Sequence, residues 1–205
     1  RRQRQMCIRD REMRVLTPSE RESLIGILME DMDSFKFGVF LVLYTGIRIG
    51  ELCALQWKDI DFARATLKVR KTIQRIQNTD SHATSKTKIV ISEPKSKSSI
   101  REIPLTSSIM EIAWKFVSFP DSYILTGTGR YIEPRTMQNH FKLYVKQSGI
   151  SDANFHALRH TFATRCVEVG FEIKSLSEIL GHASVNITLN RYVHSSFELK
   201  RSNMS

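Results

Sequence analysis

Cysteine, long apolar stretches and acidic residues are all scarce in this chain of 205 residues. Its three cysteines, Cys7, Cys53 and Cys166, follow no framework spacing and form no Cys-x-x-Cys pair, so nothing indicates a disulfide scaffold or a zinc knuckle. The longest apolar run, residues 37–44, is too short to cross a bilayer, and no secretory leader pattern opens the chain. We expect a protein of a reducing cytosol in which Cys53 and Cys166 are buried thiols.

The shortage of acidic residues leaves a large positive charge. The chain has 31 lysines and arginines against 21 aspartates and glutamates, which gives a net charge of +10. A hydrophobic fraction of 41% allows an ordinary buried core, so we expect one soluble domain of usual size. The excess of positive charge favours a polyanionic partner, and nucleic acid is favoured over a membrane surface.

Most of this charge lies in residues 63–101, which have ten basic residues against two acids. Alternating apolar and polar residues predict strands over residues 66–76, 86–92 and 100–105, and the polar residues 78–85 predict a hairpin turn. The segment could be a solvated edge sheet whose lysines deter aggregation. A sheet laid against phosphates accounts better for its basic residues, which are Arg64, Lys68, Arg70, Lys71, Arg75, Lys86, Lys88, Lys95, Lys97 and Arg101.

Helix signals occupy the rest of the chain. Thr17-Pro18-Ser19-Glu20 combines a threonine N-cap, a proline at the first helical position and a glutamate at the third. The fold class is therefore expected to be α+β and mainly α-helical, with a small three-stranded antiparallel sheet at one edge. Apolar periodicity and glycine stops predict helices over residues 17–31, 35–44, from 49 onward, 106–117, 134–147, 156–169, 173–180 and 185–192.

Arg48 follows Gly46 at the junction of two apolar helices, where its flanking residues imply that the base of its side chain is partly buried. A partly buried arginine needs an anionic partner. That partner could be Glu51, three residues further on, as a plain ion pair. It could also be a phosphodiester, because the planar guanidinium forms paired hydrogen bonds with phosphate oxygens.

His156 and Arg159 are three residues apart on a predicted helix, so both project from one face and could grip one phosphate. His160 points about 100° away from Arg159, toward the neighbouring face. His156 and His160 could instead bind zinc, but the glutamate of the His-Glu-x-x-His motif is absent and no third ligand is evident. For His160 we expect a capping or packing role in the core.

His182 follows the glycine stop Gly181, and Tyr192 comes later on a short amphipathic segment. Each has a plain structural explanation when taken alone, as a helix-end histidine and a packing tyrosine. Together with the two arginines they form a set that no folding argument requires. Two arginines can clamp a phosphate, histidines can hydrogen-bond it or move protons, and a tyrosine hydroxyl can attack it.

Four segments resemble the boxes of the tyrosine recombinase family, of the phage and conjugative-transposon integrase kind. They are TGIRIGELCALQWKDIDF, SEPKSKSSIREIPL, HALRHTFAT and LGHASVNITLNRYVH, in the family's order and spacing. The resemblance implies a tyrosine-recombinase-like catalytic domain over residues 17–194, preceded by a linker remnant, residues 1–16, from a missing N-terminal core-binding domain. The implied active site comprises Arg48, Lys95, His156, Arg159, His182 and the nucleophile Tyr192, with Lys97 as the alternative lysine.

In the implied reaction, Tyr192 attacks a phosphodiester and forms a 3′-phosphotyrosine that preserves the bond energy for rejoining. Arg48 and Arg159 stabilise the charge of the transition state, and His156 or the local positive field assists proton loss from the tyrosine. The lysine protonates the leaving 5′ oxygen, and His182 hydrogen-bonds a non-bridging oxygen. No metal ion, cofactor or ATP is expected.

The expected partner is double-stranded DNA, and no membrane partner is expected. The resemblance implies a homo-oligomer on DNA, a tetramer in a synaptic complex, with DNA-bending accessory proteins and a bacterial, cytoplasmic, nucleoid-associated location. Residues 195–205 are expected to be a tail exchanged with a neighbouring protomer, or else a frayed end. The side chains expected to contact DNA are Arg70, Lys71, Lys86, Lys88, Lys97, Arg101, Arg135, Gln138, Asn139 and Lys142.

Two other functions fit the same residues. A type IB topoisomerase uses the same chemistry without exchanging partners, and the short chain and the LGH box favour the recombinase. A DNA-binding module with an inactive site would carry similar motifs, but all the candidate residues are intact. Relaxation of supercoils without defined sites would favour the topoisomerase, whereas tight binding without a covalent adduct would favour the binding module.

Overall fold

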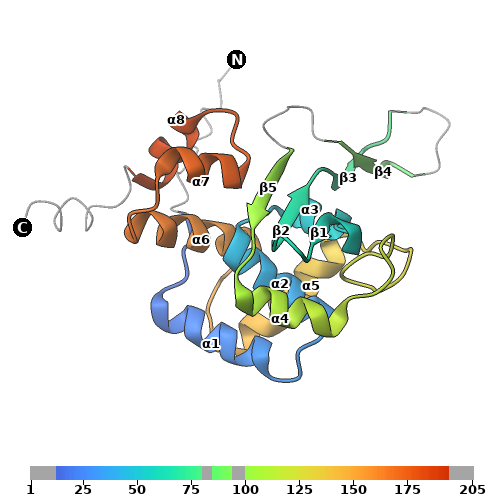
Figure 1. Ribbon diagram of the computed structural model, residues 1–205, viewed down its shortest axis with the longest axis horizontal. Coiled ribbons are helices and arrows are strands. Elements are labelled where there is room, and N and C mark those ends of the chain that lie inside the picture. The colour runs from blue at the N-terminus through green and yellow to red at the C-terminus, as the bar shows by residue number, and fades with distance from the viewer. Residues whose placement is uncertain (1–12, 80–84, 94–99, 194–205) are drawn as a thin grey trace, which may run out of the picture.

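The computed structural model describes residues 13–79, 85–93 and 100–193, and it shows a mainly helical molecule with strands along one side (Figure 1). The expected fold class is confirmed. The helices are α1 (Pro18–Met29), α2 (Ser34–Thr45), α3 (Ile49–Ala54), α4 (Ser107–Phe116), α5 (Pro134–Gln147), α6 (His156–Glu168), α7 (Ile173–Leu180) and α8 (Val185–Thr188), with the short turns η1 (Trp57–Asp59) and η3 (Leu189–Val193). The strands are β1 (Ile60–Asp61), β2 (Thr66–Val69), β3 (Thr72–Gln77), β4 (Thr87–Ser92) and β5 (Arg101–Pro104).

The first two helices begin at capping residues. The Thr17 hydroxyl accepts a hydrogen bond from the Glu20 backbone N–H (3.2 Å), and the Glu20 carboxylate accepts one from the Thr17 N–H (2.9 Å), which closes the predicted capping box of α1. α2 begins at Ser34, one residue earlier than predicted, because Asp33 caps it. It ends at Gly46, whose φ of 65° is a left-handed conformation that glycine adopts without strain.

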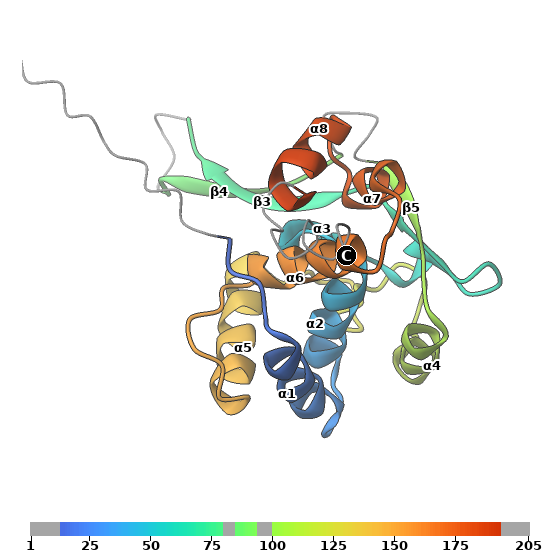
Figure 2. The same cartoon turned by 90° about the vertical axis from the view of Figure 1, so that its left-hand side faces the viewer.

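α2 is the central helix of the molecule. Eight of its twelve residues are buried, which is typical of a helix surrounded by other elements. It packs against α1, α4 and α6, and Figure 2 shows α1 beside it and α6 above it. The last turn of α2 therefore places Gly46 and the start of α3 directly beneath α6.

The predicted strand over residues 66–76 is in fact two strands. β2 pairs antiparallel with β1 and β5, with Leu67 opposite Ile103, whereas β3 pairs antiparallel with β4 in a separate hairpin. Arg70 lies between the two strands, and its guanidinium is held by the buried carboxylate of Asp59 (2.6 Å). A three-stranded antiparallel sheet is therefore present as predicted, but β1 takes the place expected for β4 (Figure 1).

A second, smaller core lies between α6, α7 and η3, above the main core in Figure 2. The π-helical turn η3 follows α8 directly and carries Tyr192 into this core. The tyrosine is therefore part of the packing of this region. The buried residues of the second core are Ala163, Val167, Leu176, Leu180 and Tyr192.

Of the two thiols expected to be buried, the structure confirms Cys53 but not Cys166. Cys53 is buried and Cys166 is half-buried, and burial raises the pKa of the first thiol to about 12 and that of the second to about 11. Cys7 lies outside the described residues. No helix within residues 13–79, 85–93 and 100–193 is long and apolar enough to cross a membrane.

Candidate active site

Arg48 occupies the N-cap of α3, directly after the turn at Gly46. Its Nη1 donates a hydrogen bond to the Glu51 carboxylate (3.0 Å), and its Nη2 donates one to the Gly181 carbonyl (3.3 Å). The ion pair with Glu51 that the sequence left open is therefore present. It does not occupy the whole guanidinium, because 39% of the Arg48 side chain remains exposed.

Glu51 is held from a second side by Arg101. The Arg101 guanidinium donates two hydrogen bonds to the two carboxylate oxygens, of 3.0 and 2.8 Å, and its Nε donates a further one to the Ile179 carbonyl. Both side chains of this pair are buried. The predicted DNA contact of Arg101 does not fit this burial, because the guanidinium faces the protein interior and ties β5 to α3 and α7.

Arg159 is buried, with 2% of its surface exposed. Its Nη1 donates to the Gly46 carbonyl (2.6 Å), and its Nη2 donates to the Leu180 carbonyl (2.8 Å) and lies 3.0 Å from the Nε2 atom of His182. Burial, and then the charge of Arg48, lower the pKa of Arg159 to about 9. A guanidinium that is fixed by backbone carbonyls and crowded by a like charge is well prepared to meet an anion.

The contact with Arg159 fixes the tautomer of His182. An arginine can only donate hydrogen bonds, so the His182 Nε2 atom accepts and the proton lies on Nδ1, which donates to the Thr188 hydroxyl (2.8 Å). Burial, and then the charges of Arg159 and Arg48, lower the pKa of this histidine to about 4. His182 is therefore neutral in this site at physiological pH.

Tyr192 is the most deeply buried member of the site, with 1% of its surface exposed. Its ring stacks on His182 at a centroid distance of 6.4 Å and an interplanar angle of 7°. Its hydroxyl lies 3.1 Å from the Nδ1 atom of His160. Burial raises the pKa of the hydroxyl, and the charges and hydrogen bonds of Arg159 and Arg191 oppose that rise.

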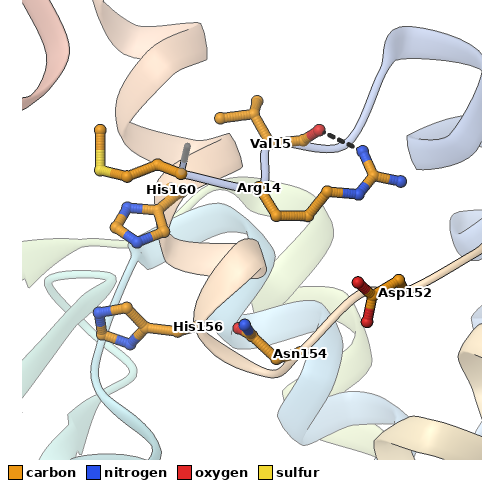
Figure 3. A pocket seen from close by; sticks show the side chains of 7 residues that line it. Arg14, Val15, Asp152, Asn154, His156 and His160 are labelled. Atoms are coloured by element: carbon orange, nitrogen blue, oxygen red, sulfur yellow. Dashed lines mark hydrogen bonds between the residues drawn. The ribbon is translucent and has the colours of Figure 1, made fainter. Parts of the chain in front are cut away.

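His156 lies apart from this hydroxyl. It is exposed at the first position of α6, and its ring meets that of His160 edge-on, with 4.8 Å between centroids. Both histidines line an open hollow of about 960 Å³, shown in Figure 3, with Arg14 and Asn154 also on its wall. We expected His156 and Arg159 to project from one face of the helix and to grip one phosphate. In the structure Arg159 points inward to the carbonyls of Gly46 and Leu180, whereas His156 is exposed.

The site has a large local excess of positive charge. Four guanidinium groups lower the pKa of His182, and Glu51 is the carboxylate that pairs with two of them. Within the described part of the chain, no group of three or more histidine, cysteine, aspartate or glutamate side chains is placed to hold a metal ion. The chemistry offered is therefore that of an anion site beside a phenol, and the four arginines are Arg48, Arg101, Arg159 and Arg191.

The predicted lysines, Lys95 and Lys97, lie outside the described residues, in the segment that leads into β5. The sequence also gave no direct signal for Thr188 or Arg191, since a helix-end threonine and a surface arginine are common. The signal that was available for Glu51 was its spacing from Arg48, three residues in a first helical turn.

The other side chains predicted to contact DNA lie mostly on the surface. Lys88 is exposed on β4, Lys86 is exposed just before it, and Lys71 is half-buried just before β3. Arg70 is partly used by its ion pair with Asp59. Along α5 the predicted residues recur every three or four positions and so share one stripe of the helix; they are Arg135, Gln138, Asn139 and Lys142.

The sequence model of the phage integrase family matches residues 14–198, which include all the arginines, histidines and the tyrosine of this site. The chain belongs to this family. It is 32% identical to the tyrosine recombinase XerC-like protein of Caldanaerobacter subterraneus subsp. tengcongensis over 191 residues. The aligned residues make up 85% of this chain and 47% of that protein. It is 28% identical to the transposase from transposon Tn916 of Enterococcus faecalis, over 92% of this chain and 51% of that protein. The chain spans about half the length of the curated relatives it matches.

Solved structures of the family share the fold. The Tn1549 transposon integrase in complex with circular intermediate DNA aligns with a TM-score of 0.72 and 27% identity, over 93% of this chain and 66% of that chain. The XerA recombinase aligns with a TM-score of 0.64 and 25% identity, over 92% of this chain and 62% of that chain. The predicted resemblance to tyrosine recombinases is therefore confirmed.

Proposed function

We propose that this chain is the catalytic domain of a site-specific DNA recombinase or integrase, which cuts and rejoins DNA strands through a 3′-phosphotyrosine intermediate. The observation that carries the proposal is the position of the Tyr192 hydroxyl, which hydrogen bonds from Arg159 and Arg191 reach inside a four-arginine cluster. A phosphodiester that binds to this cluster would lie beside the Tyr192 hydroxyl, the proposed nucleophile. Membership of a family that includes transposon transposases and integrases supports a role in integration and excision of a mobile element.

The arginines supply charge stabilisation at the reacting phosphate. Arg159 is oriented by the carbonyls of Gly46 and Leu180 and also contacts His182 and Tyr192, so a bound phosphate oxygen takes over part of this set of five N–H donors. Arg48 approaches from the exposed side, where a phosphate competes with its long contact to the Gly181 carbonyl. Such preorganised donors stabilise the charge of the transition state without the cost of reorienting dipoles during the reaction.

The reaction then exchanges one phosphate ester for another. The Tyr192 oxygen forms a bond to phosphorus while the bond to the 5′ oxygen breaks, and the product ester retains the energy needed for rejoining. We assign protonation of the leaving 5′ oxygen to Lys95, with Lys97 as the alternative. His182 is assigned to a non-bridging oxygen, a role that requires its Nε2 atom to exchange the present contact with Arg159 for a proton of its own. No metal ion, cofactor or ATP enters this sequence of steps.

Double-stranded DNA is the proposed partner. The exposed Lys86 and Lys88 and the polar stripe of α5 supply phosphate contacts and candidate base contacts, and the Tn1549 integrase structure was obtained in complex with DNA. We further propose a tetramer in a synaptic complex, with exchange of residues 195–205 between protomers and help from DNA-bending proteins. The site of action is then the bacterial nucleoid, in the cytoplasm.

The test is a nicked duplex of target DNA, labelled on the cleaved strand, so that the released fragment diffuses away and traps the covalent intermediate. A labelled protein–DNA adduct that forms in EDTA and is missing with Tyr192→Phe supports the proposal. Binding without an adduct points to an inactive binding module. Relaxation of supercoiled DNA that lacks a target site points to a topoisomerase.

A further inference from the structure

Thr188 is the last residue of α8, and its side chain is fully buried. Its hydroxyl oxygen lies 2.8 Å from the Nδ1 atom of His182, which is its hydrogen-bond partner among the described residues. Two other buried helical threonines, Thr45 and Thr161, turn their hydroxyls to the backbone carbonyl four residues earlier (2.6 and 2.8 Å). That contact is a common one for a helical threonine. The Thr188 hydroxyl instead contacts a side chain of the candidate site.

The contact with Thr188 sets the direction of the His182 ring. The other ring nitrogen, Nε2, lies 3.0 Å from the Nη2 atom of Arg159, and the ring stacks on Tyr192 with 6.4 Å between centroids. The two nitrogens lie on different sides of the ring, so a hydrogen bond that fixes Nδ1 also fixes the direction of Nε2. α8 contacts η3, which carries Tyr192, and it contacts α7, which ends just before His182 and lies beside α8 in Figure 2.

The role proposed for His182 at the phosphate requires a change at this ring. In the structure Nε2 accepts a hydrogen bond from Arg159, and the ring proton lies on Nδ1 and faces Thr188. Burial, and then the charges of Arg159 and Arg48, lower the pKa of the ring to about 4, so the ring is neutral and has one N–H group. Phosphate oxygens accept hydrogen bonds, so Nε2 binds one only when that proton lies on Nε2. Nδ1 is then left with a buried lone pair.

A hydroxyl group fits both forms of the ring. It accepts a hydrogen bond from an Nδ1–H group, and after rotation about its C–O bond it donates one to a bare Nδ1 atom. A carboxylate or a backbone carbonyl only accepts, so it would leave the second form with an unpaired buried nitrogen, which is unfavourable. Thr188 therefore allows the ring proton to change position while the hydrogen bond to Nδ1 is kept.

Solvent water balances the change of proton position. Nε2 takes one proton from water and Nδ1 returns one to water, so the ring stays neutral and no other reactant is needed. His182 borders an open hollow of about 610 Å³ between β5 and α7, which gives water access to the ring. The N–H group of Arg159 that Nε2 releases then becomes available to a phosphate oxygen.

We propose that Thr188 is a positioning residue for His182, and that its hydroxyl stays bonded to Nδ1 while the ring proton moves to Nε2 and toward the scissile phosphate. The inference rests on the proposed phosphotyrosine chemistry and assigns a part in it to a residue that acts through His182. In the free protein the hydroxyl accepts from Nδ1. In the complex with DNA it donates to Nδ1, while Nε2 donates to a non-bridging oxygen.

The first test compares Thr188→Val and Thr188→Ser in single-turnover cleavage of the nicked duplex, with the longest natural form of the protein that contains this chain. Valine keeps the shape of threonine without the hydroxyl. A loss of about 10- to 100-fold in cleavage rate is expected, as for the hydrogen-bond partners of metal-bound histidines. Serine keeps the hydroxyl and is expected to cleave within a few-fold of the unchanged protein. A folded Thr188→Val protein that does the same overturns the proposal.

Thr45→Val is the matched control for this comparison. It removes an equally buried hydroxyl that bonds a backbone carbonyl of its own helix, so it is expected to cleave within a few-fold of the unchanged protein. Thermal unfolding and DNA binding of each variant identify losses that come from folding. A loss of cleavage in Thr45→Val equal to that in Thr188→Val would mean that any buried hydroxyl has this effect, and it overturns the proposal.

A second test asks whether Thr188 acts through His182. In a His182→Asn background, Thr188→Val is expected to lower the cleavage rate by little more than His182→Asn alone, since the ring that the hydroxyl positions is gone. A residue that only supports packing lowers the rate by the same factor in both backgrounds. That result overturns the proposal.

A third test observes the ring proton and needs no change at Thr188. The ¹⁵N chemical shifts of labelled His182 are measured in the Tyr192→Phe protein, free and bound to a target duplex that it cannot cleave. A proton on Nδ1 in the free protein and on Nε2 in the complex is expected. Any other pattern, including protons on both nitrogens, overturns the proposal. If the unchanged protein forms no adduct on target DNA, the proposed function itself has failed, whereas a normal rate of adduct formation by Thr188→Val refutes the role of Thr188 alone.

Discussion

The carboxylate of Glu51 is shared between Arg101, which is buried, and Arg48, which faces the open side of the site. Arg101 takes both oxygens and also binds the Ile179 carbonyl of α7, two residues before Gly181. One carboxylate thereby fixes the orientation of Arg48 and the position of the helix end that presents His182. Burial raises the pKa of Glu51, but the hydrogen bonds and charges of Arg101 and Arg48 together outweigh this effect and hold the pKa below its usual value.

Removing one partner of this buried pair will destabilise the fold strongly. Arg101→Met takes the buried partner from the Glu51 carboxylate, and breaking a buried pair by removing one partner costs about 3–5 kcal/mol of unfolding free energy. Urea unfolding measures the change. Arg165→Ala is the matched control, because it breaks an exposed pair with Glu168, for which about 0.2–1 kcal/mol is expected. Equal losses in the two variants would show that the buried pair does not anchor the site.

Replacement of Arg48 is expected to lower the cleavage rate alone, whereas replacement of Arg159 is expected to lower both the cleavage rate and the stability. Arg48→Ala will lower the cleavage rate by about 100- to 1000-fold, the usual cost of one preorganised donor, with little change in unfolding, because its side chain is 39% exposed. Arg159→Ala will lower both, since it also leaves the carbonyls of Gly46 and Leu180 without their donor. Single-turnover cleavage and thermal unfolding, measured on the same preparations, check this contrast. It is contradicted if Arg48→Ala unfolds as readily as Arg159→Ala.

Local signals in the sequence were enough for much of the fold, whereas the candidate site was predicted from the family motifs. The capping box at Thr17 and the glycine at position 46 mark helix ends through interactions within a few residues, so they can be read without the tertiary structure. The convergence of Arg48, Arg159 and His182 could be inferred because the family motifs fix their order and spacing.

The features that the sequence did not reveal depend on distant partners. β2 and β3 carry the same alternating pattern, and they are separated by their pairing with different strands, β5 and β4, which lie further along the chain. The burial of Arg101 follows from Glu51, far from it in sequence. A histidine that contacts a tyrosine across two elements looks, in the sequence, like any other helical histidine.

The stability of the fold is expected to fall as the pH decreases from 6.5 to about 4. The pKa of both His160 and His182 is about 4 in the folded protein, below the ordinary 6.5, so the unfolded chain binds more protons in this window. Stability then rises with pH across the window. Melting temperatures measured from pH 4.5 to pH 7.5 in a series of about six buffers test the slope. The assignment fails if the combined His160→Asn and His182→Asn variant retains the same slope.

DNA binding is expected to depend on the stripe along α5. Lys142→Ala will reduce the slope of log affinity against log salt by about one, because a single phosphate contact is lost. Lys115→Ala, on α4, is the control and is expected to leave the slope unchanged. Titrations at several salt concentrations measure both. A reduced slope for Lys115→Ala together with an unchanged slope for Lys142→Ala would place the DNA on the other side of the molecule.

Gly46 joins α2 to Arg48 and α3, and its replacement tests how tightly that junction is packed. Its φ is 65°, and a Cβ atom there would lie 2.5 Å from the Phe162 ring and 2.9 Å from Leu180. Gly149 has a similar φ of 67° but open space around it. Gly149→Ala is expected to cost about 1–2 kcal/mol from backbone strain alone.

Gly46→Ala is expected to cost more than this, because the neighbouring helices α6 and α7 must also shift. It should lower the cleavage rate beyond any loss of folded protein, since the Gly46 carbonyl holds Arg159. Urea unfolding and single-turnover cleavage of the two variants measure both effects. Equal unfolding free energies for the two variants would mean that the side chains around Gly46 move aside at little cost. The position of Arg159 would then depend on its hydrogen bond to the Leu180 carbonyl.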